Sequence, residues 1–147
     1  LSMSKVDDIR KLFEVNYFAM LQIIQKVSKK MARQKKGAII NMGSIAGIEP
    51  QPGKIAYGSS KAAVMMWTKC LAKELGPMGI RVNSIAPGPI ETEMIHQYND
   101  EMLTKLASES ALRRLGKREE IAQVALFLAS EQASYINGEI IKVDGGR

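Results

Sequence analysis

Two side chains suited to proton transfer are separated by three residues in this sequence. Tyr57 and Lys61 would occupy the same face of a helix, one turn apart. A phenol has a pKa of about 10 and exchanges its proton poorly at neutral pH, but a nearby ammonium favours the phenolate and makes it a usable general acid or base. The surrounding residues are small and would let another backbone or a flat ligand come close: Gly58, Ser59, Ser60, Ala62 and Ala63. The spacing also arises by chance, so two unrelated side chains are the alternative interpretation.

Ser44 and Asn16 are two further polar residues whose positions could serve a reaction. Ser44 follows an apolar segment of strand length, and open α/β sheets bind ligands at the carboxyl ends of their strands. Its hydroxyl could polarise a substrate oxygen or simply bond to its own loop. Asn16 interrupts the apolar stripe between Phe13 and Met20. A buried amide without partners costs about 1–3 kcal/mol, so either a structural hydrogen bond between helices or a polar relay must satisfy it.

The apolar pattern predicts the elements that hold these residues. Apolar residues at spacings of three, four or seven predict a long helix over 7–31, which Gly37 would close. A second helix is predicted over 55–75, with Gly76 as its cap and Pro77 preventing its continuation. Short apolar runs predict strands at 38–42, 80–86 and 139–143, a helix is predicted over 118–130, and residues 91–115 are predicted to form short helices on a mobile insertion. This order predicts a parallel sheet and the α/β class.

The composition, with 46% hydrophobic and 24% charged residues over 147 positions, is typical of one globular domain. Much of the net charge of +6 lies at the end of the first helix, where cations complement the helix dipole. An acidic substrate or carrier is the alternative, and nucleic acid is not expected, because no aromatic residues interleave with the basic ones.

Several other classes are disfavoured. No apolar run approaches the roughly 18 residues of a membrane span, so no membrane association is expected. The N-terminal segment is charged too evenly for a signal peptide, and the single cysteine, Cys70, fits a reducing cytoplasm. Neither the carboxylates nor the single histidine, His96, cluster, so no metal site is expected, and His96 is expected to be a surface or lid residue.

In order and spacing, four residues resemble the Asn–Ser–Tyr–Lys tetrad of the classical short-chain dehydrogenases/reductases: Asn16, Ser44, Tyr57 and Lys61. The resemblance extends over essentially the whole chain. It includes the segments 13–16, 40–44, 84–92, 136–139 and 143–146. Within the family, the likeness is to the 3-oxoacyl-[acyl-carrier-protein] reductases. The resemblance implies a Rossmann-like, doubly wound parallel sheet, of which about three strands with flanking helices are present.

The resemblance also implies roles for the residues. A hydride would pass between a nicotinamide cofactor, NAD or NADP with NADP slightly favoured, and a carbonyl or secondary alcohol. Tyr57 would transfer the proton, Ser44 would orient the substrate oxygen, and Lys61 would favour the phenolate. Tyr57 and Lys61 would also contact the cofactor, and Asn16 would hold a water that relays protons to Lys61. Four residues of one loop would line the nicotinamide: Pro87, Gly88, Ile90 and Thr92.

One part of the family pattern is missing. No glycine-rich turn for the cofactor phosphates precedes the first helix; the early glycines Gly37, Gly43 and Gly47 flank the serine strand instead. Residues 1–147 are therefore expected to be the C-terminal catalytic portion of a single NAD(P)-binding domain whose N-terminal, phosphate-binding half is absent. A truncated, non-catalytic interaction protein is the alternative.

The substrate and partners are only broadly predicted. A carrier-linked 3-oxoacyl thioester is one candidate, with Lys35 expected as a basic residue near the active-site mouth and Met78 replacing a second one. A sugar, polyol or small alcohol is the competing class. The resemblance implies a homo-tetramer that pairs through the two long helices. Apolar surface for it could come from Met65, Met66, Trp67 and Leu71, although the alternative is that these residues face the sheet, as some of them must.

Overall fold

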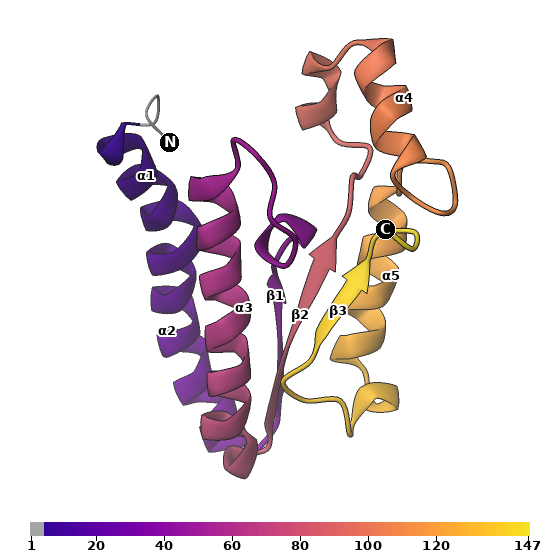
Figure 1. Ribbon diagram of the computed structural model, residues 1–147. Helices are drawn as coiled ribbons and strands as arrows, with labels where there is room; N and C mark the ends of the chain where they lie inside the picture. The colour runs from indigo at the N-terminus through magenta and orange to yellow at the C-terminus, as the bar shows by residue number, and fades with distance from the viewer. Residues whose placement is uncertain (1–4) are drawn as a thin grey trace.

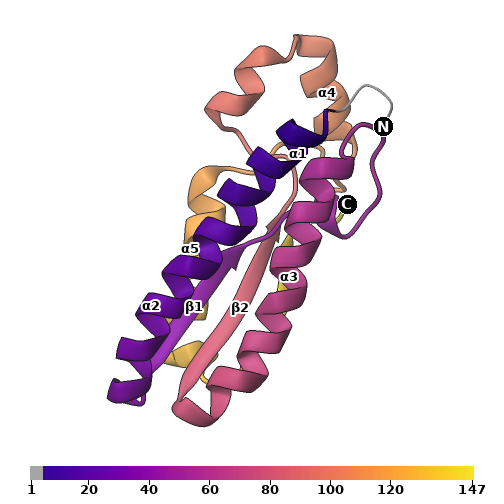
Figure 2. The same ribbon diagram turned by 90° about the vertical axis from the view of Figure 1, so that its left-hand side faces the viewer.

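The computed structural model describes residues 5–147, apart from the side chains of Met94 and His96, so the expectation for the His96 side chain lies outside the described residues. Helices cover both faces of a central sheet (Figures 1 and 2). The main elements are α1 (Val6–Phe13), a π-helical turn (Glu14–Phe18), α2 (Ala19–Gln34), β1 (Gly37–Met42), α3 (Ile55–Leu75), β2 (Ile80–Pro87), α4 (Asp100–Ser108), α5 (Arg118–Ala129) and β3 (Ile140–Val143).

The sheet has the order β1-β2-β3, and both pairs of strands are parallel, as predicted. Neighbouring residues of β1 point to opposite faces, which creates two apolar layers. Ile39 packs in the core beneath α2 and α3, where Val64, Ile80 and Val82 are also buried. Ile40 packs on the other face, against the core around Ile85 and Leu128. In Figure 2, α2 and α3 lie in front of the strands and α5 lies behind them. The α/β prediction is confirmed.

The predicted first helix is one continuous helical rod that contains a π-helical turn around Asn16. Its end was predicted wrongly. Gly37 does not close the helix but begins β1, and Lys35 is the residue that adopts the left-handed conformation, with φ 51°. The Lys35 and Lys36 N–H groups bond back to carbonyls of the last helical turn, so a lysine serves where glycine is the usual choice.

Helix α3 ends at Leu75 as predicted, but the chain does not reverse at Gly76. Gly76 keeps right-handed helical angles, with φ −52°, and the chain continues through a 3₁₀ turn over Gly76–Met78. Gly79 makes the reversal instead, with φ 76°. A Cβ on Gly79 would collide with the carbonyl oxygen of Lys35. Glycine is therefore required at position 79, where the turn before β2 packs against the turn before β1.

Of the four residues of α3 considered for an outer apolar surface, two follow the alternative interpretation and are buried. Met65 and Trp67 are buried, and the Trp67 ring packs edge-on against Tyr17, at a centroid distance of 6.3 Å. Met66 is 62% exposed and remains on the outer surface. The cause is helical periodicity, which turns adjacent residues toward different neighbours.

The segment after β2 forms a cap over the carboxyl ends of the strands (Figure 1). It contains a 3₁₀ turn (Glu93–Gln97) and α4, as the prediction of short helices required. Among the described residues, no helix combines the length and apolar character needed to cross a bilayer.

Candidate active site

Ser44 lies immediately beyond the carboxyl end of β1. It caps a 3₁₀ turn (Ile45–Gly47) by accepting a hydrogen bond from the Ala46 N–H, at 3.2 Å. The side chain is buried, with the residue 8% exposed. Because a hydroxyl can accept and donate at once, this capping bond leaves the O–H of Ser44 available to a ligand oxygen. The two interpretations of Ser44, loop bonding and ligand binding, are therefore compatible.

Small residues bring the turn after Ser44 against α3. A Cβ on Gly58 would lie 2.5 Å from the Ala46 carbonyl oxygen, and one on Gly47 would lie 2.7 Å from the Ala62 nitrogen. Side chains at these two glycines would push the turn away from the helix. The prediction that small residues near Tyr57 permit close backbone approach is confirmed.

Lys61 lies one helical turn from Tyr57, with its Nζ 5.8 Å from the centre of the phenol ring. The ammonium donates a hydrogen bond of 2.9 Å to the Met42 carbonyl, at the end of β1. Burial lowers the pKa of Lys61 below its ordinary value of 10.5. The lysine therefore links the strand that precedes Ser44 to the helix that carries Tyr57.

Asn16 contacts α3 rather than the cavity that contains Ser44. Its Nδ2 donates to the Ser60 hydroxyl at 3.2 Å, and that hydroxyl donates to the Tyr57 carbonyl at 2.8 Å. Ser60 is fully buried. The amide thus makes the structural hydrogen bond between helices that was one of its two interpretations, and through Ser60 it reaches the backbone of Tyr57. The proton-relay role of Asn16 stays a prediction.

A cavity of about 330 Å³ lies at the carboxyl ends of the strands. Ser44 and Tyr57 line it on one side, and all four predicted loop residues line it as well: Pro87, Gly88, Ile90 and Thr92. Lys61 and Asn16 are not among its lining residues. The cap contributes Ile95, Tyr98 and Leu106. A substrate oxygen held here would meet a hydroxyl and a phenol together, which is the arrangement needed to polarise a carbonyl and move a proton to or from it.

Sequence reasoning missed several polar residues of this cavity. Gln51, Lys54 and Arg147 also line it. Arg147 pairs with Glu109 at 2.9 Å and lies 3.6 Å from Glu49, so it connects the cap to the loop before α3. Since these partners are distant in sequence, only their tertiary placement reveals them.

The expected position of Lys35 near the active-site mouth is wrong within one chain. Lys35 precedes β1 and Met78 precedes β2, whereas Ser44 follows β1. Parallel strands therefore place both residues at the end of the sheet opposite the cavity. The described residues hold no group of three or more His, Cys, Asp or Glu side chains placed to bind a metal ion.

The chain is similar to known proteins in both sequence and structure. The whole chain, residues 1–147, matches the family model described as Enoyl-(Acyl carrier protein) reductase. The chain is 42% identical over 142 residues to the Thermotoga maritima protein named 3-oxoacyl-[acyl-carrier-protein] reductase FabG, which corresponds to 97% of this chain and 58% of that protein.

Two solved structures are similar over nearly the whole chain. A 3-oxoacyl-[acyl-carrier protein] reductase from Brucella melitensis with bound NAD has a TM-score of 0.92 and 33% identity, over 99% of this chain and 54% of that one. A gluconate 5-dehydrogenase from Burkholderia cenocepacia in complex with NADP and tartrate has a TM-score of 0.94 and 30% identity, over 98% of this chain and 57% of that one. The chain thus spans a little more than half the length of these relatives.

Proposed function

Because the chain belongs to the short-chain dehydrogenase/reductase family, we propose that it is the catalytic portion of an oxidoreductase that interconverts a carbonyl and a secondary alcohol with a nicotinamide nucleotide. One observation carries the proposal: Ser44, Tyr57 and the loop over residues 87–92 line the same cavity. A bound nicotinamide would supply or accept the hydride. The residues of this chain would hold the substrate oxygen and move its proton.

Each residue has a distinct task in this proposal. The Ser44 hydroxyl donates to the substrate oxygen and polarises it, and Tyr57 delivers the proton in reduction or removes it in oxidation. The Lys61 ammonium stabilises negative charge on the Tyr57 oxygen. Asn16 would hold a water that connects Lys61 to solvent.

The cofactor contacts are proposed from the same cavity. Pro87 and Gly88 would lie along the nicotinamide ring, with the Ile90 backbone and the Thr92 hydroxyl bonding to its carboxamide. Tyr57 and Lys61 would hold the neighbouring ribose. Either NAD or NADP is compatible, since the similar structures include a 3-oxoacyl-[acyl-carrier protein] reductase with NAD and a gluconate 5-dehydrogenase with NADP.

A 3-oxoacyl thioester, carried by an acyl carrier protein, is the proposed substrate, supported by the name of the Thermotoga maritima relative. A sugar acid or polyol is the second candidate, supported by the gluconate 5-dehydrogenase. The test follows absorbance of the reduced nicotinamide, using the protein at its full natural length with 3-oxoacyl thioesters, sugar acids and simple ketones. Thioester turnover that Tyr57→Phe abolishes supports the proposal. Absence of turnover with every substrate would favour the non-catalytic interaction protein.

The domain organisation is proposed along with the activity. Residues 1–147 would form the catalytic portion of one nicotinamide-binding domain, with the glycine-rich phosphate site supplied by further polypeptide. In support, the chain contains no such turn and matches 58% of the Thermotoga maritima relative. Calorimetry with the 147-residue chain alone should then detect no micromolar affinity for NADPH. Saturable micromolar binding would overturn this organisation.

A homo-tetramer in the cytoplasm completes the proposal. The outer faces of the long helices carry exposed apolar side chains suited to pairing: Val15, Ile23 and Met66 are each more than 60% exposed. Light scattering on the full-length protein should give four times the mass of one chain. A monomer at micromolar concentration would contradict the assembly.

A further inference from the structure

Backbone hydrogen bonds to two other segments hold the loop that lines the cavity. The Gly88 N–H donates to the Val143 carbonyl at 3.0 Å, and the other bonds form a bridge to Gly116. The Gly116 N–H donates to the Pro89 carbonyl at 3.0 Å, and the Glu91 N–H donates to the Gly116 carbonyl at 2.8 Å. Ile90 and Gly116 therefore form an isolated parallel bridge. Since Gly116 bonds to the residues on either side of Ile90, the N–H and C=O of Ile90 point away from Gly116 and are left for a ligand.

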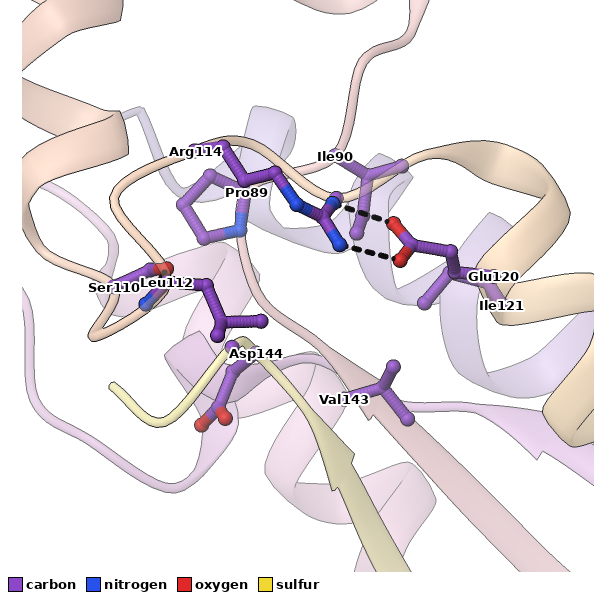
Figure 3. A pocket seen from close by; sticks show the side chains of 11 residues that line it. Pro89, Ile90, Ser110, Leu112, Arg114, Glu120, Ile121, Val143 and Asp144 are labelled. Carbon is purple, nitrogen blue, oxygen red and sulfur yellow. Dashed lines mark hydrogen bonds and ion pairs between the residues drawn. The ribbon is translucent and has the colours of Figure 1, made fainter.

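A polar clamp wraps the segment that contains Gly116. The Arg114 guanidinium grips the Glu120 carboxylate through two hydrogen bonds, of 2.8 and 2.7 Å, and also donates to the Leu115 carbonyl at 3.0 Å. The same carboxylate accepts the Lys117 N–H at 2.7 Å. Figure 3 shows the two charged groups facing each other beside Ile90. Glu120 thus binds the chain on both sides of Gly116, and the bidentate pair sets its orientation.

Packing alone does not hold the loop. The Ile90 side chain packs against Gly116, where an added Cβ would lie 2.5 Å from the Ile90 Cδ1. A cavity of about 120 Å³ adjoins the loop, bordered by Pro89, Ile90, Leu112 and Val143 (Figure 3). Because protein atoms do not fill this space, few side-chain contacts from that side restrain the loop once its polar restraint is lost.

We propose that the Arg114–Glu120 pair is a positioning device that presents the Ile90 backbone to the carboxamide of a nicotinamide. The inference rests on the proposed function and adds two residues that touch neither substrate nor cofactor. Their effect passes from the clamp to Gly116 and from Gly116 to the loop. The pair therefore governs cofactor binding, while Ser44 and Tyr57 perform the chemistry.

Hydrogen–deuterium exchange tests the clamp without cofactor or turnover. In the full-length protein, Glu120→Gln and Arg114→Lys should each accelerate exchange of the segment 88–92, because both break the fork while keeping side-chain size. Glu131→Gln is the matched control: it removes the exposed ion pair with Lys36, remote from the loop, and should leave that segment unchanged. Faster exchange confined to the start of α5 would overturn the proposal, since it would show a helix cap only.

Kinetics supply the second readout. Glu120→Gln should raise KM for the nicotinamide nucleotide about tenfold while kcat at saturating cofactor stays within about twofold, the pattern of lost binding rather than lost chemistry. A fall of about tenfold in kcat, with an unchanged KM for the nicotinamide nucleotide, would contradict the proposal. Should the unmodified protein show no turnover, the proposed function fails, while the exchange result still decides whether the clamp fixes the loop.

Discussion

The Lys61 ammonium lies 5.8 Å from the centre of the Tyr57 ring and is bonded to the Met42 carbonyl, which ends the strand before Ser44. The Lys61 side chain thus connects α3, which carries Tyr57, to the end of β1, which leads into Ser44. Partial burial of that cation has a measurable consequence for stability.

Lys61→Met should change how stability depends on pH. Burial lowers the pKa of Lys61, so the folded protein binds its proton less tightly than the unfolded chain does. The free energy of unfolding therefore rises with pH between this lowered pKa and the ordinary value of 10.5, and Lys61→Met removes that rise. Urea unfolding of both proteins from neutral pH towards 10.5 measures the difference. A difference that stays constant over this window would contradict the buried ammonium.

Gly58→Ala should destabilise the protein although it improves helix propensity. Alanine in place of glycine inside a helix ordinarily stabilises by about 1 kcal/mol. At position 58 the new Cβ would lie 2.5 Å from the Ala46 carbonyl, and relieving such a contact costs about 1–3 kcal/mol. Chemical denaturation shows whether Gly58→Ala lowers or raises the free energy of unfolding. A variant more stable than the parent would show that the turn after Ser44 does not pack on α3 as described.

Ser60→Ala should destabilise the protein by about 1–3 kcal/mol, because it removes the buried hydroxyl that accepts from the half-buried Asn16 amide and donates to the Tyr57 carbonyl. Ser59→Ala, on the exposed neighbouring position, is the matched control and should change stability by less than about 0.5 kcal/mol. Equal effects in the two variants would mean that the Asn16–Ser60 bond contributes nothing.

Glu120→Gln should matter for stability at neutral pH and not in strong acid. The hydrogen bonds from Arg114 and then from the Lys117 N–H hold the pKa of Glu120 at about 2, below its ordinary 4.5. A depressed carboxylate pKa stabilises the fold above 4.5, and this contribution disappears as the pH falls towards 2. Unfolding measured across this range should show the two proteins converging in acid. Parallel curves down to pH 2 would contradict the clamp.

The elements with strong local signals were predictable from the sequence. The bounds of α3, 55–75, agree with the structure, because a glycine and a proline directly follow its last residue. Chain reversals were less predictable: Lys35 and Gly79 take the left-handed positions that Gly37 and Gly76 were expected to mark. Which residue reverses the chain depends on how the turns before β1 and β2 pack against each other, and local sequence does not encode that packing.

The residues of the candidate site were also only partly predictable from the sequence. Ser44, Tyr57 and residues of the loop over 87–92 line one cavity, and the sequence pointed to them through the position of Ser44 after a strand and through the family resemblance. The bidentate clamp was missed, although an acidic residue in the first turn of a helix is a recognised capping signal at Glu120. Its pairing with Arg114 depends on the fold of the loop between them.

In the proposed reaction, a nicotinamide would deliver a hydride to the carbonyl carbon while the Tyr57 phenol gives a proton to the carbonyl oxygen. The direct test incubates the full-length protein with a 3-oxoacyl thioester and a reduced nicotinamide nucleotide that carries deuterium on the carbon from which the hydride leaves. Mass spectrometry then measures the deuterium in the alcohol product. We predict one deuterium per product, at a rate that Tyr57→Phe lowers by about 100-fold or more and Ser59→Ala leaves unchanged. Undiminished deuterium transfer by Tyr57→Phe would contradict the account.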